Sequence, residues 1–346
     1  MRPGDLHKLV RRNVLNLKPY STARDEFQGK ASVLLDANEL PFETGYNRYP
    51  DPHQRMLKDT ISAVKLVPAR NIFVGNGSDE AIDLLYRVFC NPGTDQVIIP
   101  QPTYGMYSVS ASINDVTALT PSLTRSFDID TDAILTAVTP RSKIIFLCSP
   151  NNPSGNLLNI AGIEKLLKQF DGLIVVDEAY TDFAHAKSWL SRLQEFPNLI
   201  VLQTLSKAWG LAGLRLGLCF AHEYVINLLD KVKPPYNING NTQQEAHKFL
   251  TTGRLEMKEH VQTILSERNK LADMLLSCNI VDHVFPSDAN FLLVRMKDAQ
   301  KVYHHLVQKG IIVRDRSNMP LCEGCLRITV GTAEENHQLI QALKQI

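Results

Sequence analysis

Long apolar segments and an excess of one charge sign are both missing from this sequence. No stretch approaches the roughly 20 apolar residues that a membrane helix needs, so we expect no membrane partner. The first residues mix charged side chains with scattered Leu and contain no apolar run of signal-peptide length, which indicates a cytoplasmic protein. The 37 Lys and Arg residues nearly balance the 36 Asp and Glu residues. The resulting net charge of +1 provides no general attraction for nucleic acid, and we expect none as a partner.

Internal repeats are absent, and cysteines are few. The six cysteines include one CxxC pair, Cys322 and Cys325, but a zinc ribbon requires a second pair. We therefore expect no metal site. The cysteines are interpreted as unreactive thiols of a reducing compartment, and a redox role for the CxxC pair is the less favoured alternative.

Length and composition are sufficient for a folded protein of two domains. The chain has 346 residues, of which 44% are apolar and 21% charged, and a domain takes roughly 150 residues. Short runs rich in Val, Ile and Leu alternate with helical patterns up to about residue 225. This alternation predicts an α/β fold with a mainly parallel sheet covered by helices on both faces. The expected strands are Asn71–Val74, Gln96–Ile99, Lys143–Leu147, Leu173–Val176, Leu199–Leu202 and Leu214–Phe220.

The pattern changes in the last third of the chain, where strands are fewer and helices longer. A long helix is expected over Thr242–Leu276, followed by strands at Asn290–Arg295 and Cys325–Val330, with a helix at Asp298–Lys309 between them. This mixture predicts a smaller α+β domain. We predict an N-terminal arm over 1–44 that joins the small domain or a partner subunit, a large α/β domain over 45–235 and a small domain over 236–346.

Polar motifs follow the expected strands of the large domain, where ligands of open α/β sheets bind. After the first strand, Gly77, Ser78 and Asp79 begin a helix whose free N–H groups and positive dipole end suit a phosphate. A plain helix cap by Ser78 is the alternative. A dinucleotide-binding turn is disfavoured because Glu80 occupies its third glycine position.

Three later strand ends carry further candidates. Asn152 lies in an Asn-Pro turn, which could be an ordinary turn, and its bond to Pro153 is a candidate for the cis form. Asp177 ends a buried apolar strand and needs a cationic partner, either a pyridine nitrogen or an arginine. Lys207, with Arg215 downstream, suggests a phosphate site with a reactive amine, although a solvated loop lysine is also possible.

Taken together and in this order, the motifs resemble the signature of the fold type I aminotransferases, which depend on pyridoxal 5′-phosphate. Further segments narrow the resemblance: Asn38-Glu39, Tyr46-Asn47-Arg48-Tyr49-Pro50, Pro102-Thr103-Tyr104-Gly105, Thr204-Leu205-Ser206-Lys207 and Cys325–Thr332. With these segments, the chain resembles the histidinol-phosphate aminotransferases over nearly its whole length. The resemblance implies a mostly parallel sheet sandwiched by helices in a large domain, with a smaller α+β domain.

The resemblance assigns roles around the cofactor. It implies that Lys207 forms the Schiff base with the cofactor and then moves the proton of the substrate carbon. Asp177 would pair with the ring nitrogen, Asn152 and Tyr180 with the ring hydroxyl, and Tyr104 would stack on the ring. Tyr49 would reach the cofactor phosphate from the neighbouring subunit of a homodimer with shared active sites. The remaining phosphate-binding residues would be Gly77, Ser78, Asp79, Thr204, Ser206 and Arg215.

The resemblance also implies a reaction. Histidinol phosphate and 2-oxoglutarate would be converted reversibly to imidazole acetol phosphate and glutamate, a step of histidine biosynthesis. Tyr20, Asn38, Arg314 and Arg327 would bind the substrates. Arg327 would hold the substrate phosphate in one half-reaction and the glutamate carboxylate in the other, because a guanidinium fork fits both anions. Leu40 and Trp209 depart from the residues common in this family.

Other functions are weighed against this one. A threonine-phosphate decarboxylase and a broad-range aromatic aminotransferase share the cofactor and remain alternatives. A nicotinamide-dependent oxidoreductase leaves Lys207 without a role. A cofactor-sensing regulator would need an added DNA-binding segment, for which we find no room in this sequence.

Overall fold

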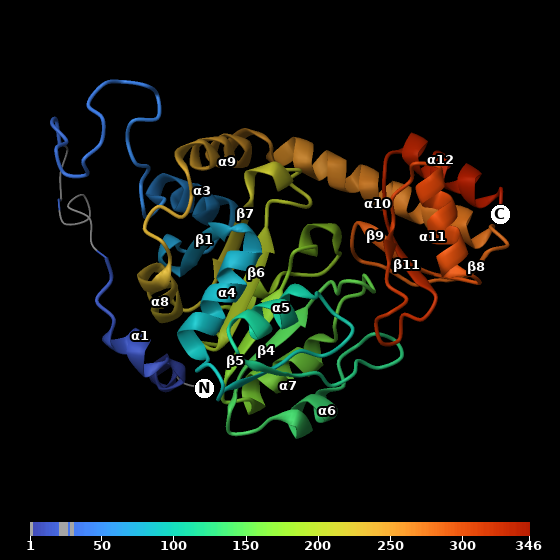
Figure 1. The fold of residues 1–346 in the computed structure, drawn as a ribbon, viewed down its shortest axis with the longest axis horizontal. Helices are drawn as coiled ribbons and strands as arrows, with labels where there is room; N and C mark the ends of the chain where they lie inside the picture. Colours follow the sequence, from blue (N-terminus) through green and yellow to red (C-terminus); the bar gives the residue numbers. More distant parts are fainter. Residues whose placement is uncertain (1–2, 21–26, 28–30) are drawn as a thin grey trace.

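The computed structural model describes residues 3–20, 27 and 31–346 and shows a large sheet and a small sheet connected by the long helix α10 (Arg254–Leu276) (Figure 1). The large sheet contains seven strands within the described residues. Their spatial order is β1 (Ile72–Asn76), β7 (Leu216–Phe220), β6 (Leu199–Thr204), β5 (Leu173–Asp177), β4 (Ser142–Cys148), β2 (Gln96–Ile98) and β3 (Thr117–Leu119).

The large sheet is mainly parallel, as the sequence predicted. Strands β3, β2, β4, β5 and β6 pair in parallel, whereas β7 runs antiparallel to both β1 and β6. Because β7 runs the other way, its first residues lie at the edge where the other strands end. Arg215, which directly precedes β7, is thereby brought to the carboxyl ends of β1 and β6.

Helices cover both faces of the large sheet. Alternate residues of each strand enter opposite cores, as Leu173 and Val175 of β5 do on one face and Ile174 and Val176 on the other. The first face is covered by α4 (Gly77–Phe89), α5 (Met106–Ile113) and α8 (Glu223–Val232). The second is covered by α3 (Arg55–Lys65), α6 (Thr131–Ala137), α7 (Ile160–Gln169) and α9 (Gly240–Thr252).

The small domain is built on an antiparallel sheet of four strands within the described part of the chain. Their spatial order is β10 (Arg314–Asp315), β11 (Cys325–Thr329), β9 (Phe291–Met296) and β8 (Val281–Val284). The end of α10 packs on this sheet with α11 (Ala299–Gln308) and α12 (Ala333–Leu343). Thr332 and Glu335 form a capping box that begins α12.

The single long helix expected over Thr242–Leu276 is divided into α9 and α10 at Gly253. Ala246 and Leu250 of α9 belong to the core of the large domain, whereas Leu271 and Leu275 of α10 belong to the core of the small domain. By packing, the change of domain therefore falls within α10, later than the expected boundary at 235–236. The sequence pattern changes where strands become fewer along the chain. This point comes before the residues at which packing passes from the core of the large domain to the core of the small domain.

The beginning of the chain packs on the large domain. The short helices Pro3–Leu9 and α1 (Arg12–Asn16) place Leu6, Val10 and Val14 in the core beneath α4 and α8. The Arg11 amide donates to the Val88 carbonyl at 2.9 Å, and Lys231 Nζ donates to the Val14 carbonyl at 2.7 Å. This part of the arm therefore packs on the large domain and not, as expected, on the small domain. The reason is that its apolar side chains pack against helices of the large domain.

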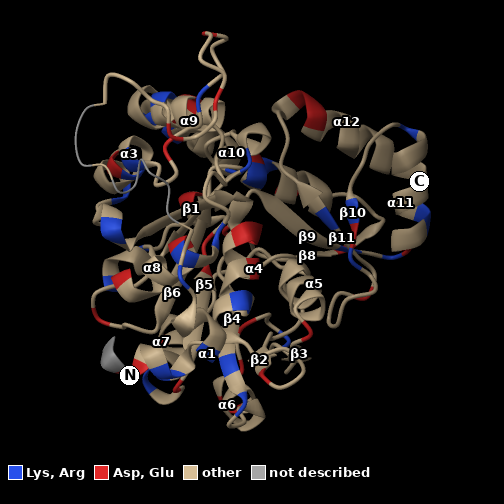
Figure 2. Cartoon of the chain, turned by 60° about the vertical axis from the view of Figure 1, so that its left-hand side comes forward, with Lys and Arg blue, Asp and Glu red and all other residues tan. Residues whose placement is uncertain are grey.

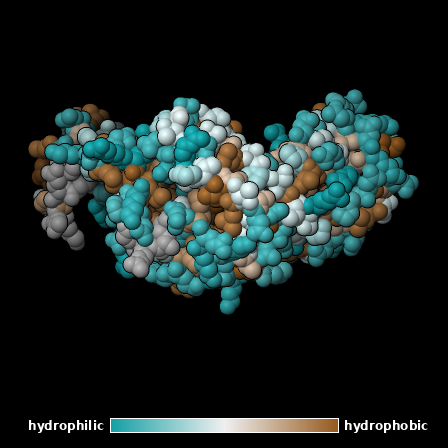
Figure 3. Space-filling model, turned by 90° about the horizontal axis from the view of Figure 1, so that it is seen from below, coloured by the Kyte–Doolittle hydropathy of each residue, from teal (hydrophilic) through white to brown (hydrophobic). Residues whose placement is uncertain are grey.

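Residues 31–49 leave the body as an extended loop (Figure 1). Leu35, Phe42 and Tyr46 are largely exposed there. In the view from below, apolar atoms likewise interrupt the hydrophilic surface in several places (Figure 3). Exposed apolar side chains are typical of a surface that contacts a partner where they form a contiguous patch.

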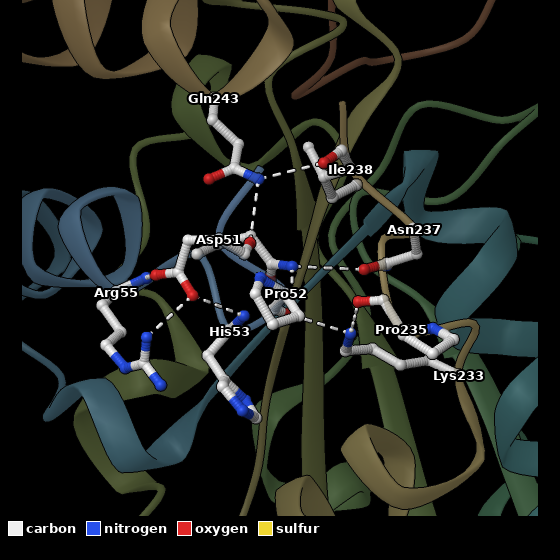
Figure 4. Close-up of polar contacts among 10 residues, drawn as sticks. Asp51, Pro52, His53, Arg55, Lys233, Pro235, Asn237, Ile238 and Gln243 are labelled. Atoms are coloured by element: carbon white, nitrogen blue, oxygen red, sulfur yellow. Dashed lines mark hydrogen bonds and ion pairs between the residues drawn. The ribbon is translucent and has the colours of Figure 1, made fainter. Parts of the chain in front are cut away.

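A buried polar cluster fixes the point where this loop returns to the large domain (Figure 4). The side chain of Lys233 donates to the carbonyls of Pro52 at 2.9 Å and Pro235 at 2.8 Å. Gln243 of α9 donates to the Asp51 carbonyl at 3.1 Å. These bonds hold residues 51–52, next to Tyr49, against the segment that leads into α9.

Charged side chains of both signs are interspersed, and neither sign gathers on the side that Figure 2 shows. Within the described ranges no helix has the length and apolar character needed to cross a bilayer.

Candidate active site

A pocket lies at the edge of the large sheet where its parallel strands end. It brings together eleven of the residues that the sequence assigned to a cofactor, together with Cys148 and Ala179, which the sequence did not single out. Cys148 lies four residues before Asn152 and Ala179 lies directly before Tyr180, and this proximity in the chain was the only available signal for them. The lining is formed by Gly77, Ser78, Asp79, Tyr104, Cys148, Asn152, Asp177, Ala179, Tyr180, Thr204, Ser206, Lys207 and Arg215.

The first turn of α4 forms one wall of the pocket. Gly77 adopts φ +71°, and a Cβ at this position would come within 2.8 Å of Arg215 Nη2. On β7, a Cβ at Gly217 would overlap the backbone of Gly77 and Ser78. Two glycines thus allow the strand to pass directly against the helix start. The free N–H groups and the positive dipole end of α4 at this place suit a bound anion.

Asp177, the last residue of β5, is 2% exposed. Its Oδ2 accepts a hydrogen bond from the Tyr107 hydroxyl at 2.7 Å and its Oδ1 accepts one from the Ala179 amide at 3.0 Å. Burial raises the pKa of Asp177 to about 6, while the two hydrogen bonds act in the opposite direction. No Lys or Arg forms an ion pair with it in the described residues. A buried carboxylate of this kind is suited to a cationic ligand.

Tyr107 was missed by the sequence analysis. It lies in α5, is fully buried and stacks on Phe146 with 5.0 Å between ring centroids. Its spacing of three residues from Tyr104 was the only signal that the two rings lie on one side of a turn. The structure places these rings edge to face, 5.4 Å apart.

Lys207 follows β6 and faces the pocket. Its Nζ lies 5.7 Å from the centroid of the Tyr180 ring. Burial lowers the pKa of Lys207, and the guanidinium groups of Arg327 and Arg215 lower it further. A lysine of lowered pKa is more often a neutral amine, and a neutral amine can act as a nucleophile or accept a proton.

The small domain meets the pocket through Arg327 on β11. Its Nη1 donates to Asn152 Oδ1 at 2.6 Å, and its guanidinium lies 5.3 Å from the centroid of the Phe291 ring. The bond between Asn152 and Pro153 is cis, which confirms that prediction. Arg314 is exposed and stands directly opposite Arg327 in the register of β10 and β11.

Arg314 and Arg327 are not part of the pocket lining itself, and three further predicted residues lie away from it. Tyr20 is 75% exposed, and Asn38 is exposed on the extended loop. Tyr49 is half-exposed and stacks on Tyr236, with ring centroids 4.4 Å apart. Within one chain, therefore, the fold does not bring these side chains to Lys207.

The CxxC pair lies away from this lining. Cys322 and Cys325 are free and buried, and burial raises the pKa of both thiols. A raised thiol pKa disfavours the reactive thiolate form.

Comparison with known proteins decides the family. A family model described as aminotransferase class I and II matches residues 28–343. The chain belongs to this aminotransferase family. It is 54% identical to the histidinol-phosphate aminotransferase of Parabacteroides distasonis over 99% of both chains. It is 51% identical to that of Cytophaga hutchinsonii over 98% of both chains.

Solved aminotransferases have the same fold as this aminotransferase. The histidinol-phosphate aminotransferase of Clostridium acetobutylicum superposes with a TM-score of 0.80 at 24% identity, covering 87% of this chain and 91% of the other. That of Sinorhizobium meliloti, solved with pyridoxal-5′-phosphate, gives a TM-score of 0.80 at 23% identity, with coverages of 86% and 82%. The fold type I architecture predicted from the sequence is confirmed.

The residues of the pocket fit pyridoxal phosphate. The relative from Sinorhizobium meliloti was solved in complex with this compound. The pocket of this aminotransferase offers a buried carboxylate that forms no ion pair within the described residues, a lysine of lowered pKa and a helix start kept clear of side chains by Gly77 and Gly217. These three features suit a protonated pyridine nitrogen, an aldehyde and a phosphate respectively.

Proposed function

We propose that this aminotransferase interconverts histidinol phosphate plus 2-oxoglutarate and imidazole acetol phosphate plus glutamate in histidine biosynthesis. Relatives that carry the name of this activity are 47–54% identical over 98–100% of the chain, which supports the proposal. The observation that carries it is one pocket containing Lys207, Asp177 and the first turn of α4, with Arg327 reaching it from the small domain.

Pyridoxal 5′-phosphate, when bound, supplies a ring that accepts electrons from the reacting substrate carbon. Asp177 would keep the ring nitrogen protonated, since its buried carboxylate forms no ion pair with a Lys or Arg of the described residues. Asn152 and Tyr180 would bind the ring hydroxyl, and Tyr104 would stack on the ring. The cofactor phosphate would be held by Gly77, Ser78, Asp79, Thr204, Ser206 and Arg215.

Lys207 would hold the cofactor and then move the proton of the reacting carbon. Its depressed pKa supports this role, because a neutral amine can accept a proton at neutral pH. Arg327 and Arg215 contribute to that depression, so the anion-binding groups of the site also keep the amine reactive.

Arg327 would bind the phosphate of one substrate and the carboxylate of the other in turn. Its half-buried guanidinium and its position next to Asn152 support this role. Arg314, opposite Arg327 in the register, is the second substrate-binding arginine that we propose. Tyr20 and Asn38 complete the proposed substrate set.

A homodimer with shared active sites would explain the residues that lie outside the pocket. Tyr49 is held on an extended loop with exposed apolar side chains and is anchored at its base by the Lys233 cluster. We propose that this loop packs on a second copy, where Tyr49 reaches the cofactor phosphate of the neighbouring subunit.

A panel of amino donors tests the proposed reaction. Histidinol phosphate, phenylalanine and threonine phosphate are each incubated with the holoenzyme and 2-oxoglutarate, and glutamate and carbon dioxide are measured. We expect the fastest glutamate formation with histidinol phosphate and no carbon dioxide from threonine phosphate. Release of carbon dioxide from threonine phosphate would favour a decarboxylase, and equal use of phenylalanine would favour a broad-range aminotransferase.

A further inference from the structure

A third arginine stands beside the two that the sequence assigned to substrate binding. The Arg316 amide donates to the Cys325 carbonyl at 2.9 Å, so the pairing of β10 with β11 continues one step beyond Asp315. Residues two apart in a strand share a face, and directly opposed residues share it as well. Arg314, Arg316 and Arg327 are therefore on one face of the small sheet.

No carboxylate of the described residues forms an ion pair with these three guanidiniums. The nearest acid in the chain, Asp315, accepts a hydrogen bond from the Ser317 amide at 2.8 Å. The Nε atoms of Arg316 and Arg327 are both buried without a hydrogen-bond partner. Like charges placed opposite each other destabilise a sheet, and buried donors without partners add to the cost. Such an arrangement is expected where an anionic ligand supplies the missing partner.

The cluster faces the pocket. Arg327 Nη1 is bonded to Asn152, which lines the pocket. Both Arg316 and Arg327 lower the pKa of Tyr180, another lining residue, although burial raises that pKa overall. Burial lowers the pKa of Arg316, and the charges of Arg327 and Arg314 lower it further, consistent with three cations directed at one place.

We infer that Arg316 is a specificity-determining residue, which with Arg314 and Arg327 forms a three-guanidinium site selecting a doubly charged phosphate monoester over a singly charged carboxylate. One guanidinium fork suffices for a carboxylate, whereas a phosphate has more oxygens and more charge to bind. The inference rests on the proposed function and deepens it, since it names the residues that distinguish the phosphorylated substrate from a carboxylate at the same site. Arg316 drew no notice in the sequence because β10, the two-residue strand that directly precedes it, was not predicted.

Anion titration of the cofactor-saturated holoenzyme tests this inference. Inorganic phosphate and acetate are titrated separately by calorimetry into wild type, Arg316→Gln and the control Arg125→Gln, which removes an exposed arginine from a loop elsewhere. Arg316→Gln should weaken phosphate binding about tenfold or more, as expected for loss of a charge-assisted hydrogen bond, and acetate binding less than twofold. Arg125→Gln should leave both unchanged.

Unchanged phosphate binding in Arg316→Gln, or an equal loss for phosphate and acetate, would overturn the inference. If that variant fails to fold, Arg316→Lys provides the test, because it keeps the charge but loses the fork. Arg316→Lys should weaken the binding of phosphate more than the binding of acetate. An unchanged ratio of the two affinities would count against the inference. Selective phosphate binding in an enzyme that does not use histidinol phosphate would refute the proposed function while leaving Arg316's role intact.

Discussion

At the scale of single residues, the protonation of Asp177 and Lys207 depends on partners from distant segments of the chain. The Tyr107 hydroxyl of α5 donates to Asp177, and the charge of Arg327 on β11 lowers the pKa of Lys207. Only the fold brings these partners within hydrogen-bond or charge–charge range. The order of motifs after the strands was therefore sufficient to select Asp177 and Lys207, but not to predict what tunes them.

Asp177 should make cofactor binding dependent on pH. Its pKa is raised to about 6 by burial, so the carboxylate becomes protonated as the pH falls through 6 and can no longer pair with a protonated ring nitrogen. The dissociation constant of the cofactor, measured by equilibrium fluorescence from pH 5 to 8, should increase below about pH 6. Asp177→Asn should bind the cofactor weakly with no such inflection and should lower turnover by orders of magnitude. An inflection that persists in the variant, or near-normal turnover, would indicate that Asp177 is structural.

Arg327→Lys should weaken both half-reactions together, because lysine keeps the charge but loses the two-pronged geometry. The expected loss is about 1.5–3 kcal/mol, roughly ten- to a hundredfold in specificity for each donor. Single-turnover kinetics with histidinol phosphate and with glutamate measure the two effects separately. Impairment with only one donor would show that the anions do not share Arg327 and would make Arg314 the candidate for the other.

At the scale of helices and strands, continuous apolar runs were predicted well and short edge elements were not. The six strands expected in the large domain all occur, within about two residues of their expected bounds. Strands β3, β8 and β10 were missed, since they are two to four residues long and lie at or near the sheet edges, where partial exposure removes the apolar pattern. Because β10 was not predicted, the position of Arg316 next to Arg314 and Arg327 was not predicted either.

The Lys233 cluster should stabilise the junction between the extended loop and α9. Lys233→Met keeps the apolar stem but leaves the carbonyls of Pro52 and Pro235 without this donor, at a cost of about 2 kcal/mol in the free energy of unfolding. Denaturant unfolding of the variant is compared with that of Lys258→Met, a change on an exposed face of α10 that should be nearly neutral. Equal stability of the two variants would show that the cluster does not hold the loop.

At the scale of the whole molecule, the fold of one chain does not bring all of the predicted site residues together in one pocket. A hydrophobic cluster packs Val261 and Leu265 of α10 and Phe291 of β9 against Tyr180, which lines the pocket. Tyr49 and Asn38 remain on the exposed loop, outside the pocket. Assembly cannot be read from one sequence, because an exposed apolar side chain has the same pattern whether it meets water or a second copy.

Mixing two inactive subunits tests the shared site. Lys207→Ala lacks the reactive amine, and Tyr49→Ala lacks the side chain proposed to cross to the neighbour. In a mixed dimer, the intact pocket of the second subunit would receive the intact Tyr49 of the first. Co-expression should therefore restore activity toward about a quarter of the wild-type level, since half of the dimers are mixed and each contains one complete site. An activity equal to the average of the two parent variants would contradict a shared site.

The central claim is that Lys207 is the residue that holds the cofactor and performs the chemistry. Borohydride reduction of the holoenzyme followed by peptide mass spectrometry tests it most directly. We predict that wild type becomes labelled at Lys207 alone, whereas Lys207→Ala is unlabelled and inactive but still binds the cofactor, because Asp177 and the first turn of α4 remain. Labelling of any other lysine in wild type, or of the Lys207→Ala variant, would contradict the account.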